Sequence, residues 1–186
     1  QGGGPLIDIG THALDLTLWI MDNYKPKYCL GTTFHKLNDQ TQTGNAWGDW
    51  DPDKFTVEDS AFGFVVMENG ATINLESAWA LNTLDVREAV TSICGTKAGA
   101  DMVDGVRINH IKNGRQCVTT ANMKAGGVAF YEGSGGDDMS TREARQWINA
   151  IVNHKQPTVL PEQAYTVTRI LEGIYESART GTVYNF

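Results

Sequence analysis

Apolar residues recur at helical spacing close to the start of the chain. The recurring residues are Leu6, Ile9, Ala13, Leu16 and Ile20. Pro5, just before them, suits the first turn of a helix. The polar positions form one narrow stripe of Asp8, Thr11, His12 and Asp15. Because a solvated helix would be polar over a much wider arc, we expect a helix over residues 5–22 that is buried on most sides, with the stripe facing a site.

In the middle of the chain the apolar pattern changes to a period of two, which is typical of strands. Residues 61–68 and 72–79 form two such runs, and Asn69-Gly70 between them is a strong hairpin signal. The first run is apolar on both faces, so we expect each face to pack against another part of the protein or a partner. Further strands are expected at residues 27–37, 86–94, 106–111 and 115–120, and the turn Asn113-Gly114 joins the last two.

Two helices are predicted near the end of the chain. Ser140 and Glu143 form a capping-box pattern before a helix at residues 144–154, and Pro161 opens a second helix at residues 162–180. The polar, glycine-rich residues 126–138 indicate a loop. This order predicts a single α+β domain over residues 1–186, with an open, mostly antiparallel (mixed) sheet and helices packed on one face.

The composition excludes several classes of function. A net charge of −7 without a long basic run argues against nucleic acid as a partner. No apolar stretch is long enough for a membrane span, since charged residues interrupt the longest one. Three cysteines without a C-x-x-C spacing fit a reducing compartment, which is the cytoplasm. The chain starts at Gln1 with three glycines following, which we interpret as a boundary inside a longer protein.

Asp8 and His12 are the first candidates for chemistry. Four positions apart on a helix, their side chains lie on one face about 6 Å apart. Asp8 lies in the first turn, where the helix dipole stabilises a carboxylate, and histidine exchanges protons near neutral pH. The alternative is an ordinary polar pair on a surface helix. A metal site is also conceivable for an Asp and a His at this spacing, but the sequence supplies no third ligand nearby, so none is predicted.

Three tryptophans are candidates for contacts with a sugar ring or for core packing. Trp47 and Trp50 lie in a segment with the composition of a loop, where an aromatic ring either stacks on a sugar or covers the core. We predict a core-covering role for Trp50 and leave both roles open for Trp47, a candidate substrate-binding residue. Trp79 ends an alternating strand and is expected in the core. The glycine clusters do not complete a phosphate-binding fingerprint.

The stretch at residues 2–15, GGGPLIDIGTHALD, resembles the second signature of the Gfo/Idh/MocA oxidoreductases, the group of glucose-fructose oxidoreductase and inositol dehydrogenase. The resemblance spans nearly the whole chain. Its further segments, in order, are VEDSAF at 57–62, NGA at 69–71, LESAWA at 75–80, GTK at 95–97, PEQA at 161–164 and ILEGIYESA at 170–178.

The resemblance implies the substrate-side, C-terminal domain of an NAD- or NADP-dependent dehydrogenase acting on a sugar or polyol. His12 then matches the residue that accepts the proton of the substrate hydroxyl, and Asp8 the carboxylate that orients the substrate or His12. Tyr131 is placed toward the nicotinamide. Most cofactor contacts belong to an N-terminal Rossmann domain that this chain lacks, so the isolated domain is expected to be inactive. Family members commonly form homo-oligomers through the open sheet face.

A second hypothesis is a non-catalytic carbohydrate-binding or oligomerisation module on the same fold. Asp8 and His12 favour the enzyme, because a binding module has no need of a proton acceptor in a narrow polar stripe. The sequence does not distinguish between sugars or between NAD and NADP, a choice made in the dinucleotide-binding domain.

Overall fold

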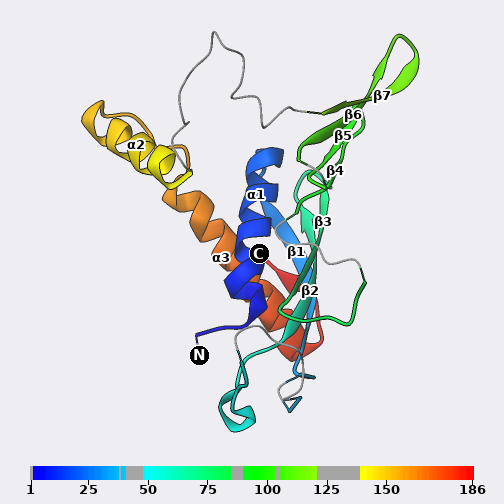
Figure 1. The fold of residues 1–186 in the computed structure, drawn as a ribbon, viewed down its shortest axis with the longest axis vertical. Helices are drawn as coiled ribbons and strands as arrows, with labels where there is room; N and C mark the ends of the chain where they lie inside the picture. The colour runs from blue at the N-terminus through cyan, green and yellow to red at the C-terminus, as the bar shows by residue number, and fades with distance from the viewer. Residues whose placement is uncertain (1, 38, 41–47, 85–89, 104, 121–138) are drawn as a thin grey trace. The chain divides into compact units, whose positions relative to one another are not determined.

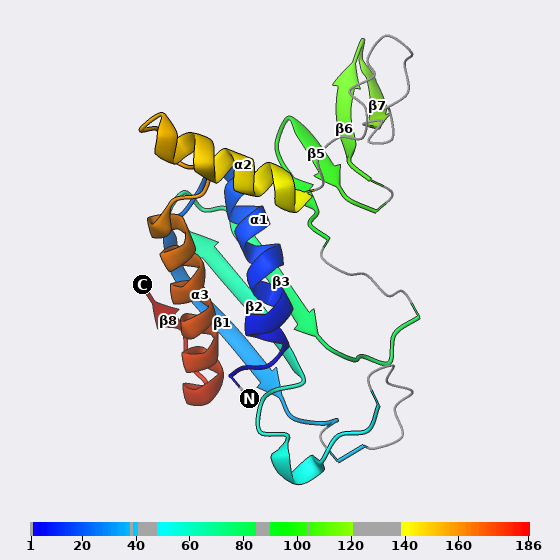
Figure 2. The same cartoon turned by 60° about the vertical axis from the view of Figure 1, so that its left-hand side comes forward.

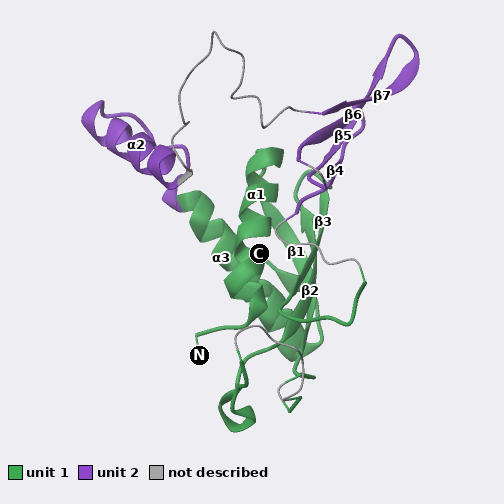
Figure 3. Cartoon of the chain, viewed as in Figure 1, with its two compact units in different colours: residues 1–89, 162–186 green, residues 90–161 purple. Residues whose placement is uncertain are grey.

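The computed structural model describes residues 2–37, 39–40, 48–84, 90–103, 105–120 and 139–186 (Figure 1). Contacts divide the chain into two units (Figure 3). The first unit combines Gln1–Ala89 with Glu162–Phe186, and the second is Val90–Pro161. Each holds one four-stranded sheet whose neighbouring strands are antiparallel. With the three α-helices these sheets confirm the predicted α+β class, with the strands divided between two sheets.

The first sheet has the strand order β3-β2-β1-β8. Its strands are β1 (Pro26–Phe34), β2 (Ser60–Met67), β3 (Thr72–Ala78) and β8 (Tyr184–Asn185). Strands β2 and β3 pair from Ser60 opposite Ala78 to Val66 opposite Thr72, so the predicted hairpin is confirmed. Gly70 in its turn has a φ of 87°, a conformation that glycine adopts without steric cost. Strand β1 ends three residues before the predicted position.

Helices α1 (Thr11–Met21) and α3 (Pro161–Thr180) cover the same face of the first sheet (Figure 2). Their apolar residues and the inward residues of β1, β2 and β3 form one core. Ile174 of α3 is fully buried over Gly31 and Gly63, which face each other on neighbouring strands. A Cβ at either glycine would lie 2.6 Å from an Ile174 carbon atom, so a larger residue there would displace the Ile174 side chain. Burial also raises the pKa of Cys29, in the same core, to about 11.

The start of the first helix differs from the prediction. Leu6–Gly10 is a π-helical turn, η1, and the regular α-helix begins only at Thr11. The expected burial on most sides is wrong, because Ile7, Ile9, Trp19 and Ile20 are exposed. Only the stripe Leu6, Gly10, Leu14 and Leu18 is buried, since the helix contacts the core along one line of residues four apart.

The second unit contains the sheet β4-β5-β6-β7 and helix α2. The elements are β4 (Ile93–Cys94), β5 (Ala98–Asp101), β6 (Arg107–Lys112), β7 (Arg115–Thr120) and α2 (Met139–Val152). The hairpin β6-β7 turns at Asn113 and Gly114, both at positive φ, as predicted. Ser140 lies inside α2 and not at its cap, so the helix begins earlier than the capping-box pattern indicated. Residues 126–138 lie outside the described part of the chain, as do residues 86–89 of the strand predicted at 86–94.

None of the helices in the described residues is long and apolar enough to cross a membrane.

Candidate functional site

Asp8 and His12 lie one turn apart where the helix changes its winding. Asp8 belongs to η1 and His12 to α1, and both side chains are exposed. Such π-helical turns occur frequently at functional sites. The predicted polar stripe is therefore present, next to the narrow buried stripe of the same helix. The polar stripe carries a carboxylate and an imidazole on adjacent turns.

Trp79 contacts Asp8 directly. Its indole Nε1 donates to Asp8 Oδ2 over 2.8 Å. Trp79 follows β3 and continues the inward series Ile73, Leu75, Ser77, which is why the alternating pattern predicted a core residue. That prediction is wrong, because Trp79 lies beyond the end of the strand, beside η1, and is 43% exposed. The alternating pattern of β3 correctly predicts the face of the sheet on which the Trp79 ring lies. The contact that the ring makes there is decided by the position of η1.

Two buried polar side chains fix η1 to the first sheet. Ser77 Oγ donates to the Pro5 carbonyl oxygen over 2.6 Å, and Glu58 Oε1 accepts from the Leu6 N–H over 3.2 Å. Ser77 and Glu58 are 3% and 4% exposed, so these bonds are shielded from water. The Leu6 N–H is the first donor of the helix and has no partner within it, so Glu58 supplies that partner. Together the two bonds hold η1, and with it Asp8, against the sheet.

Glu58 also joins η1 to α3. The Tyr175 hydroxyl donates to the same Oε1 atom over 2.7 Å. Burial, followed by the bond to Glu58, raises the pKa of Tyr175, so the phenol stays protonated as a donor. Gly4 passes directly over Glu58, and a Cβ there would overlap the Glu58 backbone oxygen and carboxyl group. The glycine before Pro5 therefore has a packing role, and sequence reasoning missed Glu58 and Tyr175 as supports of the site.

Asp15 is the last polar residue of the stripe. Its Oδ1 atom is buried and has no hydrogen-bond partner among the described residues. The pKa of nearby Tyr24 is raised by burial and then by the negative charges of Asp15 and Asp22. In the part of the chain that the structure describes, no group of three or more His, Cys, Asp or Glu side chains is arranged to hold a metal ion.

Two of the predicted contacts fall on undescribed segments. Trp47, the candidate substrate platform, and Tyr131, the candidate on the nicotinamide side, lie outside the described residues. Trp50 is described and is half-buried, with its ring centroid 6.0 Å from that of Phe55. It therefore packs on a neighbouring aromatic ring and is not part of the core formed by α1, α3 and the first sheet.

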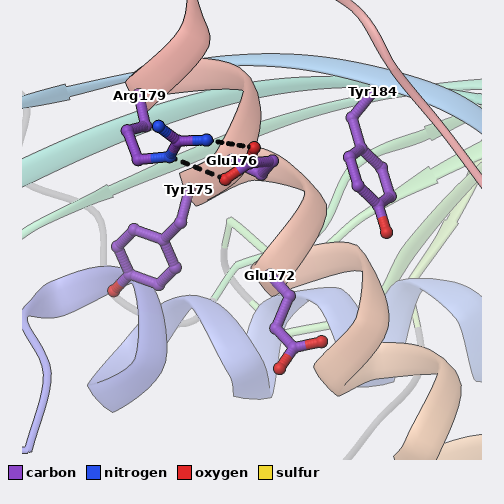
Figure 4. A pocket seen from close by; sticks show the side chains of 5 residues that line it. All are labelled: Glu172, Tyr175, Glu176, Arg179 and Tyr184. Carbon is purple, nitrogen blue, oxygen red and sulfur yellow. Dashed lines mark hydrogen bonds and ion pairs between the residues drawn. The ribbon is translucent and has the colours of Figure 1, made fainter.

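A hollow of about 390 Å³ lies elsewhere on the first unit, between α3 and β8 (Figure 4). Its lining residues are Glu172, Tyr175, Glu176, Arg179 and Tyr184. Arg179 binds the Glu176 carboxylate with two nitrogens, which lowers the pKa of Glu176 and raises that of Arg179. Neither Asp8 nor His12 lines this hollow or the one beside α2 in the second unit.

The α+β fold can be compared with known protein families. Residues 1–186 match the family model described as "Oxidoreductase family, C-terminal alpha/beta domain". The chain belongs to the Gfo/Idh/MocA oxidoreductase family.

Among curated proteins, the chain is similar to D-glucoside 3-dehydrogenase of Escherichia coli K12. The two are 34% identical over 188 residues, which cover 98% of this chain and 48% of that protein. The chain thus spans about half the length of this relative. The homologues and family are oxidoreductases, which places the chain in an enzyme family at a general level.

Solved structures share the fold at lower identity. Aldose-aldose oxidoreductase from Caulobacter crescentus, complexed with glycerol, has a TM-score of 0.71 at 18% identity and covers 100% of this chain and 48% of its own. The WlbA dehydrogenase from Bordetella pertussis, in complex with NADH and UDP-GlcNAcA, has a TM-score of 0.63 at 15% identity, covering 99% and 45%. These likenesses support the fold.

Proposed function

We propose that this chain is the C-terminal, substrate-binding and catalytic domain of an NAD- or NADP-dependent dehydrogenase that oxidises a CH–OH group of a sugar, polyol or related carbohydrate. The observation that carries the proposal is the exposed Asp8–His12 pair on a turn fixed to the sheet by Glu58 and Ser77. The similarity to D-glucoside 3-dehydrogenase supports the substrate class.

In this proposal His12 accepts the proton of the substrate hydroxyl. A base held against the hydroxyl lowers the barrier as negative charge develops on the oxygen. Asp8, held by the Trp79 N–H, orients the hydroxyl or His12 and stabilises the imidazolium that forms. When bound, the nicotinamide supplies the acceptor for the hydride that leaves the same carbon.

The dinucleotide belongs mainly to a further, N-terminal Rossmann domain in this proposal. Binding of a pyrophosphate needs free backbone N–H groups at the start of a helix. At the start of η1 the Leu6 N–H is bonded to Glu58, and Gly4 is packed against it, so this turn is not available for a phosphate. The residues described here therefore fit the substrate side of the reaction.

The three free cysteines support a reducing compartment, the cytoplasm.

The direct test uses the protein in which this domain is joined to its dinucleotide-binding domain. We expect reduction of NAD or NADP, followed by absorbance, with a panel of methyl glucosides, free aldoses and inositols. Sugars that bind in calorimetry without turnover, with either cofactor, would instead favour the carbohydrate-binding module.

The outer face of the first sheet supports a further proposal, that the protein forms homo-oligomers. Strands β1 and β2 place apolar side chains on the face opposite α1 and α3, and Leu30 and Phe64 are cross-strand partners that are 45% and 41% exposed. Exposed apolar patches of this kind mark interaction sites. A second copy with the same face gives a self-complementary interface.

We expect Phe64→Glu to convert the dimer or larger oligomer to a monomer in sedimentation at micromolar concentration. A buried charge without a partner is strongly unfavourable at an apolar interface. Ile111→Glu is the matched control, because it adds the same charge at a 66% exposed apolar position of the second sheet. A monomeric parent protein, or an oligomer that survives Phe64→Glu, would contradict the proposal.

A further inference from the structure

Three aromatic rings form a row that begins at the Asp8 carboxylate. Trp79 donates its indole N–H to Asp8, and its ring centroid lies 6.1 Å from that of Phe55 at an interplanar angle of 90°. The Phe55 centroid lies 6.0 Å from that of Trp50, at 48°. All four residues belong to the first unit. The row therefore leads away from the candidate catalytic pair in two successive ring contacts.

The position of these rings is not explained by core packing. None of the three belongs to the cluster of buried and packed residues between α1, α3 and the first sheet. Trp79 is 43% exposed, and Phe55 and Trp50 are half-buried. Phe55 directly follows the short helix η2 (Pro52–Lys54), whose start is capped by the Asp51 side chain bonding to the Asp53 N–H. Phe55 is thus held next to Trp79 by a defined local structure.

Partly exposed aromatic rings next to a polar group are suited to bind carbohydrates and planar aglycones. The C–H face of a pyranose or the face of an aryl group packs on the rings, while hydroxyl groups bond to neighbouring polar atoms. One sugar ring at Asp8 and His12 reaches Trp79 but is too short to extend along two further ring contacts. The length of the row therefore fits a substrate with a second ring.

We propose that Trp50, Phe55 and Trp79 form a subsite for the aglycone or second sugar of a glycoside, whose other ring lies at Asp8 and His12. The inference rests on the proposed function, and it names the substrate class as glycosides with a second ring. The subsite contributes binding remote from the reacting carbon. Because Trp79 contacts both Asp8 and Phe55, it sets the position of the second ring of the glycoside relative to Asp8.

The test compares two substrates that differ only in the aglycone, methyl β-D-glucoside and 4-nitrophenyl β-D-glucoside, in the protein with its dinucleotide-binding domain. Trp50→Ala and Phe55→Leu each remove an aromatic face away from Asp8. We expect each to raise KM for the aryl glucoside by about 3–10-fold, the range of an aromatic contact. The kcat and KM for the methyl glucoside should stay within about twofold of the parent values.

Tyr165→Ala is the matched control, because it removes an aromatic ring that is 65% exposed on α3. It should leave both substrates unchanged. Melting temperatures identify a variant that does not fold, and Phe55→Leu, which keeps an apolar side chain, serves if Trp50→Ala fails. Equal effects on both glucosides, or none on either, would overturn the subsite.

Calorimetric Kd values separate this inference from the proposed function. If the parent protein binds the aryl glucoside more tightly than the methyl glucoside and loses this preference in Trp50→Ala, the subsite stands, even without turnover. Absence of turnover with every sugar would count against the dehydrogenase alone. Turnover of both glucosides without any preference would count against the subsite alone.

Discussion

Replacing His12 by Ala should lower kcat by about 10²–10⁴-fold in the protein that includes its dinucleotide-binding domain, because a positioned general base contributes a factor of this size. The side chain is exposed at the start of α1, so the fold should stay intact. We measure kcat with saturating sugar and the melting temperature on the same preparation, so that a loss of catalysis is distinguished from a loss of the fold.

Two further variants sharpen this prediction. Asp8→Asn keeps the shape of the side chain and the bond from Trp79 but removes the charge that stabilises a protonated imidazole, so kcat should fall as well. His110→Ala, in β6 of the second sheet, removes a histidine that bonds to Thr119 and should leave kcat unchanged. Turnover close to that of the parent in both His12→Ala and Asp8→Asn would contradict the catalytic assignment.

Glu58→Ala is expected to lower the free energy of unfolding by about 2–5 kcal/mol, measured by urea denaturation. The substitution leaves the Leu6 N–H and the Tyr175 hydroxyl without their common acceptor in a buried site. Glu58→Gln, which retains an acceptor oxygen, should lose less than Glu58→Ala. Glu68→Ala, at an exposed glutamate of the β2-β3 turn, is the matched control and should stay within about 0.5 kcal/mol of the parent.

Tyr175→Phe tests whether Glu58 and Tyr175 act together. The two residues share a bond of 2.7 Å, so their effects on stability should be non-additive in a double-mutant cycle. Because the pKa of Tyr175 is raised on folding, its contribution is present below the ordinary tyrosine value of 10.0 and is lost as the pH rises toward the raised pKa. Tyr175→Phe should therefore reduce the loss of stability above pH 10. Additive effects and an unchanged alkaline profile would show that the shared bond contributes nothing.

The elements that follow from local pattern were predicted well. Two turns, Asn69-Gly70 and Asn113-Gly114, have residues that hairpin turns favour, and both predicted hairpins are present. Pro161 opens α3 as expected, and Gly181, at a φ of 68°, follows its last residue. The catalytic candidates Asp8 and His12 came from a four-residue spacing within one polar stripe. In each case the signal lies within a few neighbouring positions.

The supports of the site were not predictable in this way, because their partners are far apart in the sequence. The Trp79–Asp8 bond joins residues 71 positions apart, the Leu6–Glu58 bond 52 and the Tyr175–Glu58 bond 117. The sequence does not distinguish a buried glutamate such as Glu58 from a solvated one. An alternating strand indicates which face of the sheet Trp79 lies on, but not which residue it contacts.

By itself the sequence determined the α+β class, the hairpins and the family, since these depend on short-range periodicity, turn chemistry and an ordered set of motifs, and it singled out Asp8 and His12 as the pair proposed to be catalytic. Only the tertiary structure decided that the helix starts with a π-helical turn, that Glu58 fixes this turn, and that aromatic rings lead away from Asp8. The physical reason is that buried polar groups and aromatic rings are satisfied by whichever element the fold brings beside them, and that neighbour is chosen by packing of the whole unit.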